Sequence, residues 1–168
     1  PMQGRAPRAL ILVPTRELAV QVGESVRTYG KYLRMFSQTI FGGVSINPQI
    51  DALRRGTDIL IATPGRLLDH VQQRTADLRH IEILVLDEAD RMLDMGFHDD
   101  IATVAKQCPK QRQTLLFSAT YPEGIAKLSE AFMREPQTVT VAEQHSATKI
   151  RQLFFEVRED ERLHAVSL

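Results

Sequence analysis

The sequence is poor in cysteine, since its 168 residues contain only Cys108. A single cysteine excludes an intramolecular disulfide framework and a cysteine-rich zinc site. It favours a reducing, intracellular setting, and we expect the cytoplasm. No apolar run approaches the roughly 20 residues that a membrane-spanning helix needs, so no membrane partner is expected. Residues 1–5 carry neither an apolar signal segment nor an initiating Met, and we expect the chain to begin inside a longer protein.

The sequence also lacks an excess of charge of either sign. Its 21 Lys and Arg residues balance its 21 Asp and Glu residues, so the formal charge is zero. No overall basic field attracts nucleic acid, and any phosphate must be bound by local groups. There is no internal repeat and no Gly/Ser linker. Apolar residues make up 43% and charged residues 25%, which excludes a disordered or low-complexity chain.

Short apolar runs alternate with helical patterns along the chain. The runs predicted to form buried strands are 9–13, 38–41, 58–62, 81–86, 114–117 and 138–141. Continuous apolar strands that alternate with amphipathic helices indicate βαβ crossovers and a parallel α/β sheet. Residues 142–149 are small and polar, which suits a linker. Residues 150–157 then predict another strand, and residues 159–168 the start of a helix.

Polar or glycine-bearing clusters follow five of the predicted strands. In parallel sheets a site lies beyond the carboxyl ends of the strands. The clusters are therefore expected to meet at one edge of the sheet: Pro14-Thr15-Arg16, Gly42-Gly43, Thr63-Pro64-Gly65-Arg66, Asp87-Glu88-Ala89-Asp90 and Ser118-Ala119-Thr120.

The acidic cluster contains three carboxylates in four residues, Asp87, Glu88 and Asp90, directly after the buried run 83–86. Such carboxylates repel one another unless a cation lies among them, and a strand-end acidic group suits Mg²⁺. One carboxylate can hold the metal shell while its neighbour orients a water molecule. The alternative is a solvated acidic turn before a helix. The apolar strand before the cluster favours the metal site.

The other clusters suit phosphate or sugar–phosphate binding, each with a simpler structural alternative. Backbone N–H groups after Thr63 can bind a phosphate, and Arg66 can add charge, or the segment is only a turn. Thr15 is a good helix cap, which does not exclude phosphate binding by the same segment. Gly42-Gly43 can let a nucleic-acid backbone approach closely or can be a simple turn.

Ser118 and Thr120 bring two hydroxyl groups to the same edge, where they can bond Asp90 or cap a helix before Pro122. Cys108 lies on an apolar helix face and is predicted to be a core residue. The histidines show no pair at metal-ligand spacing, so surface positions are expected for His70, His80, His98, His145 and His164.

In this order the motifs resemble the DEAD-box ATP-dependent RNA helicases, in their bacterial form. The matching segments are PTRELA (14–19), GG (42–43), TPGR (63–66), DEAD (87–90) and SAT (118–120). The resemblance covers about residues 8 to 160. It implies a RecA-like parallel sheet flanked by helices, of the P-loop NTPase class, with ATP and Mg²⁺ as cofactors and RNA as the partner.

The resemblance also implies a role for each motif. Asp87 would hold Mg²⁺ through water, Glu88 would activate the water that attacks the γ-phosphate, and Asp90 would contact Ser118 and Thr120 to couple hydrolysis to domain closure. Contacts to the RNA sugar–phosphate backbone would be sequence-tolerant. The residues implied to line the RNA are Pro14, Thr15, Arg16, Gly42, Gly43, Thr63, Pro64, Gly65 and Arg66.

The sequence departs from the family pattern in one respect. It contains no G-x-x-x-x-G-K-[ST] phosphate loop, and the arginine motifs of the second domain are also absent. We therefore expect an incomplete first RecA-like domain over residues 1–141, which lacks the phosphate-loop strand, a linker over 142–149, and the start of the second RecA-like domain over 150–168. Alone, this piece is expected to be poorly stable and to neither hydrolyse ATP nor unwind RNA.

Two other functions stay open at this stage. One is a non-catalytic RNA-binding or clamp subunit on the same fold, against which the intact Asp87-Glu88 pair argues. The other is a DNA helicase of the same superfamily, which the combined motif wording disfavours. Ribonucleoprotein partners would bind through flanking segments outside these 168 residues.

Overall fold

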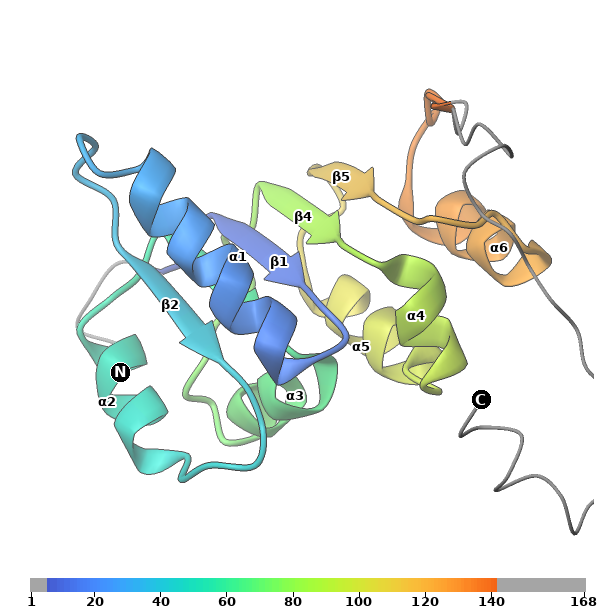
Figure 1. Cartoon of the computed structure of the whole chain (residues 1–168). Coiled ribbons are helices and arrows are strands. Elements are labelled where there is room, and N and C mark those ends of the chain that lie inside the picture. The colour runs from blue at the N-terminus through green and yellow to red at the C-terminus, as the bar shows by residue number, and fades with distance from the viewer. Residues whose placement is uncertain (1–5, 142–168) are drawn as a thin grey trace, which may run out of the picture. The chain divides into compact units, whose positions relative to one another are not determined.

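The computed structural model describes residues 6–141, and its helices and strands form an α/β unit (Figure 1). Strands and helices alternate along the chain, as the apolar runs predict. Their order is β1 (Ala9–Leu12), α1 (Arg16–Tyr29), β2 (Ser37–Ile40), α2 (Asn47–Arg54), β3 (Ile59–Ala62), α3 (Pro64–Gln72), β4 (Ile83–Leu86), α4 (Ala89–Asp94), α5 (His98–Gln107), β5 (Gln113–Leu116) and α6 (Glu123–Phe132).

The five strands form one sheet in the order β2-β3-β1-β4-β5, and every neighbouring pair is parallel. The predicted parallel α/β fold is therefore confirmed. Leu12 of β1 pairs with Ala62 of β3 and with Leu86 of β4. Because these last residues are level, the carboxyl ends of the strands make a continuous edge, from which the motif segments leave.

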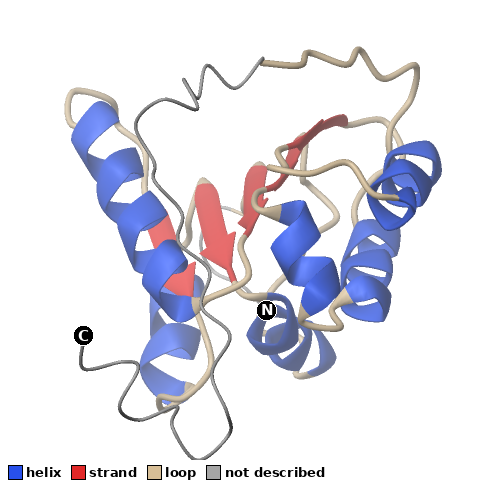
Figure 2. Cartoon of the chain, turned by 45° about the vertical axis from the view of Figure 1, so that its right-hand side comes forward, coloured by secondary structure: helices blue, strands red, loops and turns tan. Residues whose placement is uncertain are grey.

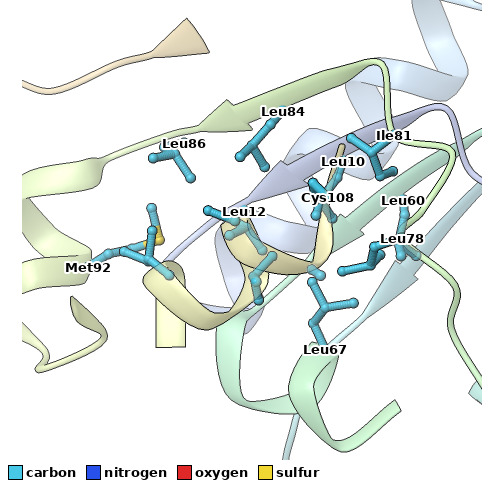
Figure 3. Packing of buried hydrophobic residues seen from close by; sticks show 14 of the residues in the cluster. Leu10, Leu12, Leu60, Leu67, Leu78, Ile81, Leu84, Leu86, Met92 and Cys108 are labelled. Carbon is cyan, nitrogen blue, oxygen red and sulfur yellow. The ribbon is translucent and has the colours of Figure 1, made fainter. Parts of the chain in front are cut away.

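Apolar side chains cover both faces of the sheet, because successive strand residues point to opposite sides. Leu10 and Leu12 pack into the larger core cluster with Leu67 of α3 (Figure 3). On the opposite face, Ile61 packs with Ala19 of α1. Figure 2 shows helices on both sides of the strands. A sheet covered in this way explains why β1, β3 and β4 are continuously apolar rather than alternating.

The sixth predicted strand is wrong. Residues 138–141 have no secondary structure, and the side chains of Val139 and Val141 are 86% and 85% exposed. An apolar run forms a strand only where a neighbouring strand takes up its backbone hydrogen bonds. Within residues 6–141, β5 pairs only with β4, and residues 138–141 pair with no strand. The run therefore has the composition of a strand without the partner.

The chain divides into two compact units, Pro1–Pro136 and Gln137–Leu168. The first contains the sheet and all the helices named above. The predicted linker over 142–149 and the predicted elements over 150–168 lie outside the described residues. In the described part of the chain, no helix has both the length and the apolar character to cross a membrane.

Candidate functional site at the carboxyl edge of the sheet

The strand order sorts the motif segments into two halves of one edge. Gly42-Gly43 follows β2, residues 63–66 follow β3 and residues 14–16 follow β1, and these three strands are neighbours. Residues 87–90 follow β4 and residues 118–120 follow β5, on the other side of β1. Gly42, Gly43, Arg16 and Arg66 thus lie on one half of the edge, and the carboxylates with Ser118 and Thr120 lie on the other. The sequence predicted the common edge but not this division.

The acidic segment leaves β4 through a tight, hydrogen-bonded turn. Asp87 donates its N–H to Leu12 O at 3.0 Å, and its Oδ1 accepts the N–H of Glu88 at 3.0 Å. Glu88 has φ 50° and ψ 51°, the left-handed conformation, which costs a non-glycine residue about 1–3 kcal/mol. The next N–H, of Ala89, donates to Phe117 O at 3.0 Å. These bonds hold the exposed Glu88 at the edge in a conformation that the sequence does not reveal.

Asp90 connects the acidic segment with the end of β5. Its Oδ2 accepts both the N–H and the hydroxyl of Thr120, each at 2.9 Å. Its backbone N–H donates to Ser118 Oγ at 3.3 Å, and that hydroxyl donates to Thr120 O at 2.6 Å. Neither hydroxyl caps α6, which begins after Pro122 without a side-chain cap. Of the two alternatives for this segment, the structure therefore contains the contact with Asp90.

These hydrogen bonds stabilise the carboxylate form of Asp90. Partial burial alone would raise the pKa of this carboxyl group, but bonds from the Thr120 hydroxyl, the Thr120 N–H and the Arg91 N–H outweigh it. The pKa of Asp90 is consequently lowered, and the group is a carboxylate at neutral pH. The hydrogen bonds from Thr120 thus hold the negatively charged Asp90 side chain in place beside Asp87 and Glu88.

The carboxylate half fits a magnesium ion that is bound mainly by other ligands. In residues 6–141, no three His, Cys, Asp or Glu side chains lie close enough to enclose a metal ion. Mg²⁺ commonly binds through one or two carboxylates together with water molecules and the phosphates of a substrate. Asp87, half-buried at the end of β4, suits that mode of binding, whereas a closed metal site is excluded for the described residues.

On the other half of the edge, the segment after β1 starts α1. Thr15 caps this helix, and its Oγ1 accepts the N–H of Leu18 at 3.2 Å. The predicted cap is therefore confirmed. Arg16 is exposed, and its guanidinium lies 5.2 Å from the centre of the Phe41 ring. This cation–π contact brings the segments after β1 and β2 together.

The segment after β3 has unused donors. Thr63 precedes α3, but its side chain makes no capping hydrogen bond. Gly65 is exposed, and a Cβ built there would meet no atom within 4 Å. The side chain of Arg66 is only 12% exposed; its Nη2 donates to Val44 O at 2.9 Å. Its Nε lies 3.4 Å from Asp69 Oδ2 without the alignment of a hydrogen bond, and Nη1 also lacks a hydrogen-bond partner among residues 6–141.

The Gly42-Gly43 turn is exposed on its outer side, and hydrogen bonds to its flanking carbonyls hold it in place. Gly43 has φ 79°, a conformation that favours glycine, and a Cβ at either position would meet no atom within 4 Å. The two carbonyls that bracket the pair are both occupied. Gln49 Nε2 donates to Phe41 O at 3.0 Å, and Arg66 donates to Val44 O. The turn is therefore anchored from α2 and α3 while its outer side stays accessible.

The structure corrects one prediction about histidine and confirms another about cysteine. His80 and His98 are exposed, but His70 is completely buried, so the surface position predicted for it is wrong. Its ring binds two polar side chains, which sequence periodicity does not register. His145 and His164 lie outside the described residues. Cys108 is buried in the core as predicted, and burial raises the pKa of its thiol to about 11.

Comparison with known proteins agrees with this geometry. The family model for DEAD/DEAH box helicases matches residues 2–128. The ATP-dependent RNA helicase CshA of Listeria monocytogenes is 47% identical over 163 residues, which cover 95% of this chain and 31% of that protein. The DEAD-box ATP-dependent RNA helicase CshA of Bacillus subtilis is 43% identical over 161 residues, with coverages of 95% and 33%. The chain thus spans about a third of the length of these curated relatives.

Solved structures show the same fold. A hypothetical ATP-dependent RNA helicase from Sulfolobus tokodaii superposes with a TM-score of 0.73 at 41% identity, over 78% of this chain and 39% of that one. The yeast DEAD-box splicing factor Prp28 gives a TM-score of 0.74 at 36% identity, over 77% and 31%. The sheet and its edge therefore define a RecA-like α/β domain. Within that class, the chain belongs to the DEAD/DEAH box helicase family.

Proposed function

We propose that the protein carrying this chain is an RNA-dependent ATPase of the DEAD-box type that uses ATP to separate RNA duplexes locally. The observation that carries the proposal is the division of the edge. A carboxylate half that suits a metal-bound nucleotide lies directly beside an arginine and glycine half that suits a phosphate backbone. The relatives whose names include RNA helicase support RNA as the polymer.

In the nucleotide half, two carboxylates divide the work. Asp87, half-buried and anchored to β1 and Glu88, would hold the water shell of Mg²⁺. The bound ion would neutralise charge on the phosphates. Glu88, exposed at the edge, would accept a proton from the water molecule that attacks the γ-phosphate or orient that water. Glu88 follows Asp87 directly and has a left-handed backbone, so both residues lie at the same edge of the sheet.

In the RNA half, the proposed contacts are to the sugar–phosphate backbone. The amino-terminal N–H groups of α3 suit phosphate oxygens, and Arg66, whose side chain is 12% exposed and holds Val44 O, adds positive charge beside them. The open Gly42-Gly43 turn allows close approach of a strand, and Arg16 adds positive charge. Pro14 and Pro64 are buried and shape their turns rather than offer donors. Such contacts carry no base information.

Asp90 is proposed to couple ATP hydrolysis to domain closure. It is the side chain that fixes the end of β5 to the acidic segment, through Ser118 and Thr120. We propose that this connection links hydrolysis at Asp87 and Glu88 to domain closure through the segment 118–120. We also propose that residues 1–141 belong to a first RecA-like domain, that 142–149 connect it onward, and that 150–168 begin a second one.

The test is ATP hydrolysis by the full-length protein with and without single-stranded RNA. We expect RNA to stimulate hydrolysis at least tenfold, DNA of the same sequence to stimulate it much less, and an RNA duplex to be separated in preference to a DNA duplex. RNA binding without any ATP hydrolysis would instead support the non-catalytic clamp subunit. Equal activity on DNA would contradict RNA as the substrate.

A further inference from the structure

His70 is a buried polar residue that the proposed chemistry does not use. It lies on α3, one turn after Arg66, and its side chain has no exposed surface. Its Nδ1 is 2.8 Å from Thr75 Oγ1, and its Nε2 is 3.3 Å from Gln49 Oε1. Because the ring is buried, loss of either partner would leave a polar atom unsatisfied at a high cost, so the hydrogen bonds hold the members of this cluster in place.

The hydrogen bonds of Gln49 indicate which nitrogen of the His70 ring carries the proton. Gln49 donates Nε2 to Phe41 O, so its Oε1 faces the ring and needs a donor. His70 Nε2 therefore carries the proton. Burial lowers the pKa of His70, and the charge of Arg66 lowers it further against the opposing effect of Asp69, so the ring is neutral and Nδ1 is an acceptor. Thr75 Oγ1 lies 2.8 Å from Nδ1 and 3.1 Å from His70 O, and its single proton can serve only one of these two acceptors.

The chain of bonds ends beside the glycine turn. It runs from Thr75 through His70 and Gln49 to the carbonyl of Phe41, the residue before Gly42-Gly43. On the other side of the turn, Arg66 of the same α3 helix holds Val44 O at 2.9 Å. Helix α3 thus fixes both ends of the turn. Arg66 holds one end directly, and His70 holds the other end through Gln49.

We propose that His70 and Gln49 are positioning residues that set the Gly42-Gly43 turn for RNA binding. They act through the Phe41 carbonyl and touch neither RNA nor nucleotide. Without the His70 ring, Gln49 loses the hydrogen bond that orients its amide. Without the Gln49 amide, the turn keeps only the Arg66 contact. Because a turn with glycine at φ 79° has many alternatives when free, RNA binding must then also order it. This inference rests on the proposed RNA function.

The substitution His70→Leu tests the proposal in the full-length protein. A fluorescent single-stranded oligouridylate is titrated in the presence of a non-hydrolysable ATP analogue. We expect Kd to rise about five- to tenfold, the factor that one lost hydrogen bond carries. At saturating RNA, kcat for ATP hydrolysis should stay within about twofold, because Asp87 and Glu88 lie on the other half of the edge.

Conservative variants separate positioning from mere folding. The side-chain nitrogen of Gln reaches the place of His Nε2, whereas that of Asn reaches only the place of Nδ1. His70→Gln should therefore restore RNA affinity to within about twofold, and His70→Asn should not. Gln49→Leu should match His70→Leu, and the double variant should be no worse than either, since both break one chain of bonds.

Thr57→Val is the matched control. Thr57 is also buried, and its hydroxyl donates to Phe36 O and Ile59 O at the opposite edge of the sheet. Thr57→Val should lower the melting temperature without changing the Kd for RNA. If it weakens RNA binding as much as His70→Leu does, the effect is general destabilisation and the proposal is wrong. Unchanged RNA affinity in folded His70→Leu also overturns it.

A measurement without RNA distinguishes this proposal from the proposed function. With ¹⁵N-labelled glycine, we expect the backbone order parameters of Gly42 and Gly43 to fall in His70→Leu and to recover in His70→Gln. If those order parameters do not change, the positioning proposal fails regardless of RNA. If they change as expected but the wild-type protein binds no RNA, the proposed function fails, and with it the purpose assigned to the turn.

Discussion

Asp90 is the residue through which the two strand ends β4 and β5 act as one unit. A carboxylate that accepts the N–H and the hydroxyl of Thr120 has its pKa lowered, so its stabilising effect is complete above the ordinary pKa of an aspartate, about 3.9. That stabilisation is lost as the pH falls through the lowered pKa of the folded state, where the group takes up a proton.

The substitution Asp90→Asn should therefore lower the free energy of unfolding at pH 7 by about 1 kcal/mol, since an amide replaces a charged acceptor. The difference from the wild-type protein should shrink as the pH is lowered below about 4. Urea unfolding of the full-length protein at several pH values measures this. A difference that is the same at pH 7 and pH 3.5 would show that the charge of Asp90 does not contribute.

Cys108 provides a second prediction for a single side chain. Because burial raises the pKa of its thiol to about 11, only about one molecule in a thousand carries the reactive thiolate at pH 8. We expect iodoacetamide at that pH to leave Cys108 unmodified in the folded protein and to alkylate it fully in concentrated urea. Mass spectrometry of the peptide measures both. Rapid modification of the native protein would mean that α5 does not bury this residue as described.

Side chains were predictable from the sequence where their neighbours in the chain decide their position. Thr15 caps its helix because the residues that it caps follow directly, whereas for Thr120 the sequence left a helix cap and the contact with Asp90 as open alternatives. The burial of His70 was not predictable, because it depends on Gln49 and Thr75, which approach only after folding. The left-handed Glu88 also has no local signal, since glutamate does not favour that conformation.

At the level of elements, β1, β3 and β4 were predictable because each is an apolar run bounded by polar residues, and β2 and β5 because a shorter apolar stretch lies between helical patterns. The fourth begins at Ile83 rather than Ile81, since the N–H of Ile81 bonds to Leu78 O in a turn. The run 138–141 failed because apolar composition describes a strand without supplying its neighbour. The strand order that divides the edge was not predictable either, since each crossover is compatible with several positions in the sheet.

The contact between α1 and β2 gives a prediction at this level. An alanine in a helix is usually about 1 kcal/mol more favourable than a glycine. At Gly23 of α1, however, an added Cβ would lie 2.5 Å from Thr39 Oγ1 of β2. Gly23→Ala should therefore fail to stabilise the protein and should instead lower its melting temperature.

The variant Gly23→Ala/Thr39→Ala removes the obstructing hydroxyl and should recover most of the loss. Thermal unfolding of the single and double variants measures the coupling between the two positions. If Gly23→Ala raises the melting temperature, the helix does not lie against the strand at this distance.

At the scale of the whole molecule, zero net charge is compatible with RNA binding because the charges are sorted within the edge. Arg16 and Arg66 lie on the side of β1 that carries the glycine turn, and Asp87, Glu88 and Asp90 lie on the other side. A polyanion therefore meets local positive charge, and the carboxylates are left to a metal ion. The composition shows that positive and negative side chains are equal in number but not where they lie in the fold.

The 168 residues alone should be inactive. They contain no G-x-x-x-x-G-K-[ST] segment to bind the β- and γ-phosphates, and within residues 6–141 the outer side of β5 has no partner strand. We expect no RNA-stimulated ATP hydrolysis and a broad thermal transition from the purified 168-residue piece. A sharp, cooperative transition would show that the sheet is sufficient as it stands. Measurable RNA-stimulated hydrolysis would show that another group binds the phosphates.

The central claim is that the carboxylate half performs hydrolysis while the other half holds RNA. It is tested most directly by Glu88→Gln in the full-length protein, with Glu82→Gln, at the amino end of the same strand, as control. ATP turnover and ATP-dependent RNA binding are measured on the same preparations. We predict that Glu88→Gln lowers turnover at least a hundredfold while its affinity for RNA stays within about threefold, and that the control changes neither. Unchanged turnover in Glu88→Gln would contradict the account.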